Sequence, residues 1–286
     1  MIHPTFDGPI LLATGDPVGT VLTFFFLIVT QLGGQPFFLL IIPYLYWGRD
    51  RRLGLEMAIM LLTGFYINLY IKEWFKIPRP TGKAVPWGLE NESYSFPSGH
   101  AQGTVAFWTY LSLQIRTRWA IIAGVVLTVL ISYSRIYLEV HRWMDIFGGL
   151  ALGLVLAMSF HLLKGPAETA LQRIGHGPRL ALAIVIPLAM FLATGSVTFG
   201  RLMGFLMGAV AGAEIETRDL GMPDCKDGPQ RWKRLAVGYT LCAIIMFGLG
   251  YFGPGVPGWQ FVVYTLAGMG VTLFAPLLFS TFESRD

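Results

Sequence analysis

The chain has 286 residues, of which 54% are hydrophobic and 13% charged, whereas soluble domains carry roughly 25% charged residues. Several uncharged apolar runs approach the roughly 20 residues that cross a bilayer as a helix, and the alternating pattern of a membrane barrel is absent. The net charge of +4 comes from basic residues in short loops rather than on one face, which argues against a nucleic-acid partner. We therefore predict an all-α, polytopic membrane helix bundle.

The apolar runs predict about nine membrane spans. Residues 1–18 are interpreted as an N-terminal tail or interfacial segment. The first span, 19–47, is interrupted by Gly33-Gly34 and Pro43, which predicts a break or a tilt. The remaining spans are predicted at 54–75, 100–115, 119–138, 143–164, 179–195, 198–214, 235–253 and 258–280. A core of spans, residues 19–164, is followed by a C-terminal extension, residues 165–286, of about four spans, which begins with a polar link at 165–178.

The Lys and Arg residues divide unequally between the two sets of alternate loops, and the richer set is expected to be cytoplasmic. This places the N-terminus outside and the C-terminus in the cytoplasm. The polar segments around residues 72–100 and 134–145 then lie on the extracytoplasmic face. The expected location is the inner or plasma membrane, or the ER membrane in a eukaryote.

Three segments on that face collect polar and ionisable residues, which are costly near a membrane unless they have partners or a function. The segments are 72–80, 97–100 and 134–145, and together they supply two or three cations, a hydroxyl, helix-terminal N–H groups, two imidazoles and a carboxylate. Arginine and lysine bind phosphate oxygens, and the N–H groups at a helix N-terminus bind anions. No Asp, His or Glu cluster has the spacing of a metal site. The set therefore favours metal-free phosphoryl transfer stabilised by fixed positive charge.

The spacing of His141 and Asp145 places both side chains on one face of a helix if a span begins there. The carboxylate then accepts a hydrogen bond from one ring nitrogen and leaves the other nitrogen free to act as a nucleophile. His100 is the candidate to protonate the leaving oxygen, because an imidazole titrates near neutral pH.

Each of these residues also has a purely structural explanation. Pro97-Ser98-Gly99 is ordinary turn and capping chemistry before a helix. Lys72 and Arg79 could extend along the interface to keep their charges in water, and an acidic residue such as Asp145 favours a helix start. Their coincidence on one predicted face favours a functional site over several separate structural roles.

The same residues resemble the three-part signature of the type 2 phosphatidic acid phosphatase superfamily, K-x6-RP, PSGH and SR-x5-H-x3-D. The matching stretches, without a substitution, are Lys72 to Pro80, Pro97 to His100 and Ser134 to Asp145. The resemblance covers residues 35–160. It implies that His141 attacks phosphorus to form a phosphohistidine, that Asp145 orients it, and that His100 acts first as general acid and then as base for water. It also implies that the phosphate oxygens are held by Lys72, Arg79, Arg135, Ser98 and the Gly99 N–H.

The predicted function is hydrolysis of a phosphomonoester or pyrophosphate on a lipid, with no metal or other cofactor. A lipid partner is favoured because the site is expected at the membrane interface, where a phosphorylated head group can enter from the leaflet. Polyprenyl diphosphate, phosphatidate, phosphatidylglycerol phosphate and a sphingoid phosphate are all candidates. The alternatives are a sugar-phosphate phosphatase, a lipid phosphotransferase and a non-enzymatic lipid carrier or scramblase.

The predicted function leaves two further sequence patterns to be explained. Glu139 and Arg142 flank the predicted nucleophile where many relatives have Gly and an apolar residue, and contact with a substrate head group is one explanation. Glycines recur at every fourth position as Gly200, Gly204, Gly208 and Gly212, which permits two helices to approach closely. That face is expected to pack within the chain, with a homodimer seam as the alternative.

Overall fold

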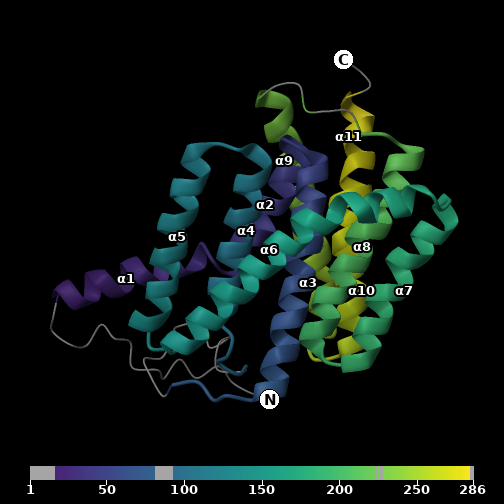
Figure 1. Ribbon diagram of the computed structural model, residues 1–286. Helices are drawn as coiled ribbons and strands as arrows, with labels where there is room; N and C mark the ends of the chain where they lie inside the picture. The colour runs from purple at the N-terminus through teal and green to yellow at the C-terminus, as the bar shows by residue number, and fades with distance from the viewer. Residues whose placement is uncertain (1–16, 81–92, 223–224, 226–227, 284–286) are drawn as a thin grey trace. The chain divides into compact units, whose positions relative to one another are not determined.

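The computed structural model describes residues 17–80, 93–222, 225 and 228–283, and the regular structure of those residues is all helical (Figure 1). The chain begins with α1 (Pro17–Gln31), α2 (Gln35–Gly48), α3 (Arg51–Phe75), α4 (Gly99–Ile115), α5 (Arg118–Tyr137) and α6 (Trp143–Gln172). It continues with α7 (His176–Thr194), α8 (Val197–Asp219), α9 (Gly228–Ala243), α10 (Pro257–Met269) and α11 (Ala275–Glu283). Two π-helical segments, Ile244–Leu249 and Gly270–Phe274, extend α9 and join α10 to α11. The predicted all-α class is confirmed, and the predicted tail at 1–18 lies outside the described residues up to residue 16.

Within the described residues, 6 helical stretches are long and apolar enough to cross a bilayer, or 7 if α1 and α2 are one bent span. They are α3, α5, α6, α7, α9 with its π-helical extension, and the run from α10 through α11. The chain is an integral membrane protein. The count of nine spans stays a prediction, because α4 has only 17 residues and α8 is rich in glycine and carries charged residues. At a rise of 1.5 Å per residue α4 reaches about 26 Å, short of the roughly 30 Å hydrocarbon core.

The predicted interruption of the first apolar run is confirmed. α1 ends at Gln31 and α2 begins at Gln35, and the two helices are bent by 43° at this break. The residues between them include Gly33 and Gly34, whereas Pro43 lies inside α2. The glycine pair therefore makes the break.

The predicted polar link at 165–178 is shorter in the structure, and the prediction was wrong for its first half. α6 continues to Gln172 with Pro166 inside it, and α7 begins at His176. Glu168, in this added stretch, forms an ion pair with Arg52 Nη2 at 2.5 Å. A charged helix end of this kind has the polarity of a loop, so hydropathy alone does not separate the two.

Contacts divide the chain into two compact units. The first unit comprises residues up to 38 and 67–161, and the second comprises 39–66 and the residues from 162 onward. The C-terminal turns of α3 and the N-terminal part of α6 thus belong to the first unit, together with all three signature segments. The division at residue 164 into core and extension stays a prediction.

In the first unit, α4 and α5 lie side by side and α1 crosses α5 (Figure 1). α6 packs against the start of α4 through small residues. A Cβ placed on Gly149 would stand 2.5 Å from the Ser98 carbonyl oxygen, and one on Gly153 would meet the Gln102 carbonyl. This close approach allows the Ser98 N–H to donate to the Asp145 carbonyl at 2.9 Å. The second and third signature segments are thereby joined through their backbones.

In the second unit, the glycine face of α8 packs against α10. A Cβ on Gly200 would stand 2.9 Å from the Pro257 carbonyl oxygen, and Cβ atoms on Gly204 and Gly208 would meet the carbonyls of Phe261 and Thr265. These contacts are to backbone atoms, which cannot rotate away as a side chain can. The glycine face is used within the chain, as the first interpretation expected.

Candidate active site

The three signature segments deliver their side chains from the ends of four helices in the first unit. Lys72 lies in the last turn of α3, and Arg79 follows that helix. Ser98 precedes α4, and Arg135 lies in the last turn of α5. The third segment then enters α6, whose first turn carries Asp145. Helix ends are sites where backbone groups lack intrahelical partners, so they suit the binding of charged groups.

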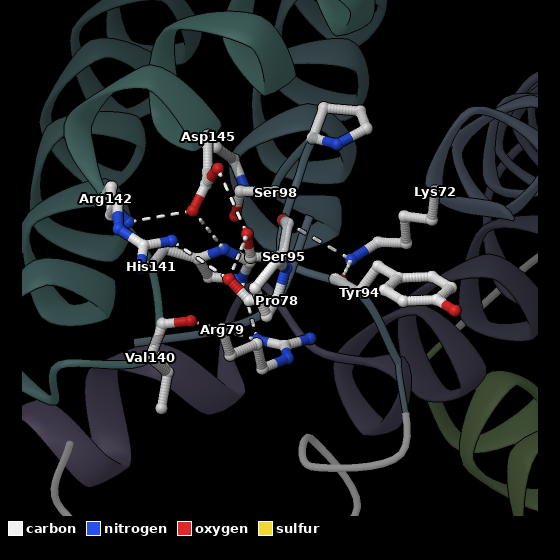
Figure 2. Close-up of polar contacts among 12 residues, drawn as sticks. Lys72, Pro78, Arg79, Tyr94, Ser95, Ser98, Val140, His141, Arg142 and Asp145 are labelled. Atoms are coloured by element: carbon white, nitrogen blue, oxygen red, sulfur yellow. Dashed lines mark hydrogen bonds and ion pairs between the residues drawn. The ribbon is translucent and has the colours of Figure 1, made fainter. Parts of the chain in front are cut away.

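His141 and Asp145 form a buried pair. The His141 Nδ1 lies 3.3 Å from the Asp145 Oδ2, and both side chains are almost fully buried (Figure 2). The backbone N–H of Arg142 donates to the same carboxylate oxygen at 2.8 Å. The predicted i, i+4 contact is therefore present, although His141 itself stands just before the helix.

The tautomer of His141 follows from its second contact. Its Nε2 lies 3.1 Å from Arg79 Nη1. A guanidinium has no acceptor, so in this contact Nε2 must accept with its lone pair. The ring proton is then on Nδ1 and is donated to Asp145. The arrangement presents an unprotonated Nε2 directed at a cation.

Arg79 is held in place by backbone and side-chain oxygens. Its Nε donates to the Ser93 carbonyl at 2.8 Å and its Nη2 to the Ser93 hydroxyl at 3.0 Å. Its Nη1 donates to the Val140 carbonyl at 3.1 Å (Figure 2). Burial lowers the pKa of Arg79 to about 10, and the negative charge of Asp145 opposes this shift. The guanidinium therefore remains charged at neutral pH.

Two more cations are buried in the same unit. Lys72 Nζ donates to the carbonyl of Tyr94 and lies 3.5 Å from that of Ser95. Arg135 is fully buried, and its Nη1 donates to the hydroxyl of Thr30 in α1 at 2.7 Å. These carbonyl and hydroxyl partners are neutral groups, and a buried cation held by neutral oxygens suits the binding of an anion.

The Pro97–His100 segment is a capped helix start. Ser98 is the N-cap of α4, and its Oγ accepts from the Ala101 N–H at 3.5 Å. α4 begins at Gly99, whose N–H lies in the first turn and has no acceptor within the helix. His100 lies in that turn. The capping interpretation of Pro97-Ser98-Gly99 is correct, and the same geometry offers donors to an anion.

Comparison with known proteins identifies the family. The model of the PAP2 superfamily, the type 2 phosphatidic acid phosphatases, matches residues 53–168. A second model, described as PAP2 superfamily phosphatase, transmembrane extension, matches residues 200–285. Phosphatidylglycerophosphatase B of Bacillus subtilis (strain 168) is 33% identical over 151 residues, which cover 48% of this chain and 71% of that protein. The chain belongs to the PAP2 superfamily.

Eukaryotic PAP2 relatives match a smaller share of their own length. Sphingosine-1-phosphate phosphatase 1 of Mus musculus is 27% identical over 179 residues, which are 59% of this chain and 41% of that protein. Lipid phosphate phosphatase delta of Arabidopsis thaliana is 27% identical over 165 residues, 52% of this chain and 40% of that protein. The resemblance seen in the three motifs is confirmed at the level of the family.

Buried polar residues outside the PAP2 signature support its loops. Asn68, one helical turn before Lys72, donates from Nδ2 to the Pro97 carbonyl at 3.2 Å and to Gln102 Oε1 at 2.6 Å. Ser95 Oγ donates to Asp145 Oδ1 at 3.3 Å. Sequence reasoning missed these residues. The available signal was a polar amide inside an apolar run, one turn from a PAP2 motif residue.

Arg142 connects two PAP2 motifs rather than standing free for a head group. Its Nη1 donates to the Pro78 carbonyl at 2.9 Å, while its backbone N–H serves Asp145. The third motif is thereby tied to the backbone of the first, next to Arg79. The suggestion that Arg142 touches the substrate is not needed to explain its position.

Glu139 adopts a left-handed backbone conformation, with φ of 56°. A side chain in this region costs roughly 1–2 kcal/mol, and glycine avoids most of that cost. Glu139→Gly is therefore expected to raise the free energy of unfolding. The gain is limited to about 1 kcal/mol, because glycine also has more entropy in the unfolded chain, which offsets part of the relief. Thermal melts of the wild type, Glu139→Gly and Glu139→Ala would test this. Equal melting temperatures for the glycine and alanine variants would contradict it.

The burial of His141 predicts a pH dependence of stability. Burial lowers the pKa of His141 well below its usual value; the hydrogen bond to Asp145 opposes the shift, and the charges of Arg135, Arg79 and Lys72 add to it. Below pH 6.5 the unfolded chain binds a proton here and the folded protein does not. Stability therefore falls by about 1.4 kcal/mol per pH unit from this group as the pH drops.

His141→Asn removes the pH-dependent contribution of this imidazole to stability. Its melting temperature is expected to fall less than that of the wild type between pH 6.5 and pH 5. Melting curves at matched ionic strength measure the difference. Parallel pH profiles for the two proteins would mean that the pKa of His141 is the same in the folded and unfolded states, which contradicts the prediction.

Proposed function

We propose that the chain is a metal-independent membrane phosphatase that hydrolyses a phosphomonoester or pyrophosphate on a lipid. The observation that carries the proposal is the position of His141. Its Nδ1 faces the Asp145 carboxylate, and its unprotonated Nε2 faces the guanidinium of Arg79. An imidazole held in this way, with cations around it, is suited to attack an anionic phosphorus centre.

In the first step, phosphate oxygens accept the hydrogen bonds of Arg79, which releases the Nε2 lone pair. Nε2 attacks phosphorus, the N–P bond forms, and the bond from phosphorus to the leaving oxygen breaks. His100 gives a proton to that oxygen. The ring of His141 gains positive charge, which the adjacent Asp145 carboxylate stabilises.

In the second step, water attacks the phosphohistidine. His100, now neutral, accepts a proton from the water, and the N–P bond breaks to release inorganic phosphate. Lys72, Arg79 and Arg135 stabilise the charge on the equatorial oxygens in both steps, together with the Ser98 hydroxyl and the Gly99 N–H.

The donor set supports chemistry without a metal. The site offers three cations and a single carboxylate, whereas divalent cations in proteins bind oxygen-rich or His- and Cys-rich sets. Among the residues that the structure describes, no group of three or more His, Cys, Asp and Glu side chains is arranged to hold a metal ion. Fixed positive charge would then do what a metal does in other phosphatases.

A lipid substrate is supported by two findings. The chain is integral to the membrane, and the relatives reported above are named for lipid phosphates: phosphatidylglycerophosphate, sphingosine 1-phosphate and lipid phosphate in general. We place the site on the extracytoplasmic face, because the loops rich in Lys and Arg alternate with those that carry the signature.

The test is phosphate release by the purified protein in detergent containing EDTA. The substrates are polyprenyl diphosphate, phosphatidate, phosphatidylglycerol phosphate and sphingosine 1-phosphate, with glucose 6-phosphate as the soluble comparison. We expect vanadate-sensitive release from at least one lipid and little from the sugar phosphate. No release from any lipid, or release only after a divalent cation is added, would contradict the proposal. Adding an alcohol acceptor separates hydrolysis from phosphotransfer.

A further inference from the structure

α1 belongs with the candidate active site although it lies outside the matched PAP2 range. The match to the PAP2 superfamily model begins at residue 53, whereas α1 ends at Gln31. α1 nevertheless belongs to the first unit, together with the signature segments. Near its end, Thr30 Oγ1 accepts a hydrogen bond from Arg135 Nη1 at 2.7 Å. Thr30 is 2% exposed and Arg135 is fully buried. The contact is therefore shielded from water, where a charge-assisted hydrogen bond is strongest.

The turn that follows α1 packs against α4 and α5 and so fixes the position of Thr30 beside Arg135. A Cβ on Gly33 would stand 2.7 Å from the side chains of both Ile131 and Thr104, so the turn packs directly on α4 and α5. A Cβ on Gly34 would stand 3.4 Å from Nε2 of His100. The break between α1 and α2 thus lies beside the imidazole of His100, and the end of α1 lies against Arg135.

We propose that Thr30 is a positioning residue that fixes the direction of the Arg135 guanidinium for phosphate binding. This inference rests on the function proposed above. An arginine side chain has several rotatable bonds, so fixing its position when the substrate binds costs conformational entropy. The hydrogen bond from Arg135 to Thr30 fixes the guanidinium before the substrate binds, which removes this cost from the reaction. Thr30 does not touch the substrate in this proposal. It acts only through Arg135.

The test compares three single variants of the detergent-purified protein. Thr30→Val removes the hydroxyl and keeps the shape, while Thr30→Ser keeps the hydroxyl. Thr23→Val is the matched control, because Thr23 is also buried in α1, and its hydroxyl lies 2.8 Å from the Gly19 carbonyl oxygen and 3.3 Å from the Tyr137 hydroxyl. Each protein is assayed for kcat and KM with the lipid that the wild type hydrolyses, and for inhibition by vanadate.

We expect Thr30→Val to lower kcat/KM by about tenfold to a hundredfold, the range for losing a hydrogen bond to a charged group. The effect should fall on kcat more than on KM, and the vanadate inhibition constant should rise by a similar factor, because vanadate imitates the transferring phosphoryl group. Thr30→Ser is expected to recover most of the activity. Thr23→Val should stay close to the wild type.

A double-mutant cycle makes the assignment to Arg135 specific. If Thr30 acts through Arg135, Thr30→Val should add little to the loss already caused by Arg135→Lys, because lysine cannot reproduce the guanidinium geometry. Full additivity of the two substitutions would overturn the inference. So would equal effects of Thr30→Val and Thr30→Ser, since these would indicate packing rather than hydrogen bonding.

A binding measurement separates this inference from the proposed function and does not depend on turnover. Vanadate is added to each variant, and the shift of its melting temperature is recorded. A wild type that neither releases phosphate nor is stabilised by vanadate would overturn the proposed function. A wild type that does both, with Thr30→Val showing the same kinetics and the same vanadate shift, would overturn only the role of Thr30.

Discussion

Replacing His141 with asparagine is expected to lower phosphate release by roughly 10⁴- to 10⁶-fold, the range seen when a nucleophile is removed from a group of residues that act together. Asparagine fits the space and can still hydrogen-bond to Asp145, but it has no nitrogen lone pair with which to attack phosphorus. The loss should therefore appear in kcat and leave the fold intact. Steady-state phosphate release, with the melting temperature measured on the same preparation, tests both statements.

His161→Asn is the matched control for this substitution. His161 lies in α6 within the first unit, and its Nδ1 is 3.3 Å from the Gln114 Nε2, away from the signature residues. It should retain nearly full activity. Appreciable turnover by His141→Asn would exclude the covalent route, and Asp145 or a bound water would then have to be considered as the base in a direct attack.

A trapped intermediate would strengthen the result. Acid-labile, base-stable phosphate on the wild-type protein, found after rapid quenching and missing from His141→Asn, is the expected chemistry of a phosphohistidine. The hydrogen-bond pattern predicts which nitrogen carries the phosphate. Nδ1 holds the ring proton against Asp145, so the phosphate should be on Nε2.

The motif residues could be predicted from the sequence because their spacing follows helix geometry. His141 and Asp145 are four residues apart, and the structure brings their side chains together at the start of α6. Ser98 has the chemistry of an N-cap and serves as one. Local rules of this kind need no knowledge of the tertiary fold.

Contacts between distant segments could not be predicted in the same way. Thr30 reaches Arg135 across 105 positions of the chain, and nothing in the apolar composition of α1 distinguishes it from an ordinary span. Asn68 and Gln102 were similarly missed, because their side chains meet across 34 positions of the chain. The continuation of α6 beyond residue 164 was not predicted, because its polar end forms an ion pair between Glu168 and Arg52, which lie far apart in the sequence.

The glycine face of α8 was predicted as a site of close helix approach, and the partner that the structure provides makes a second strong prediction possible. Gly208→Leu is expected to destabilise the second unit by more than about 3 kcal/mol, beyond the roughly 1–3 kcal/mol that overpacking usually costs. Even a Cβ at this position meets the Thr265 carbonyl, and it lies 2.9 Å from the Met269 N–H nitrogen. Neither backbone atom can move without displacing α10. We expect a lower melting temperature and a lower yield of monodisperse protein.

Gly258→Leu is the matched control, because Gly258 lies in α10 and no heavy atom stands within 4 Å of a Cβ placed there. This change should be neutral or slightly stabilising, since leucine has a higher helix propensity than glycine by up to about 1 kcal/mol. Contacts from the α10 side also indicate packing against α8. Gly268 of α10 approaches the Phe205 carbonyl, and Thr272 Oγ1 donates to the Gly208 carbonyl at 3.4 Å. If Gly208→Leu instead kept its melting temperature and changed only the oligomeric state, the glycine face would be a seam between two copies and not between α8 and α10. A monomeric, destabilised variant is the outcome that the packing within the chain requires.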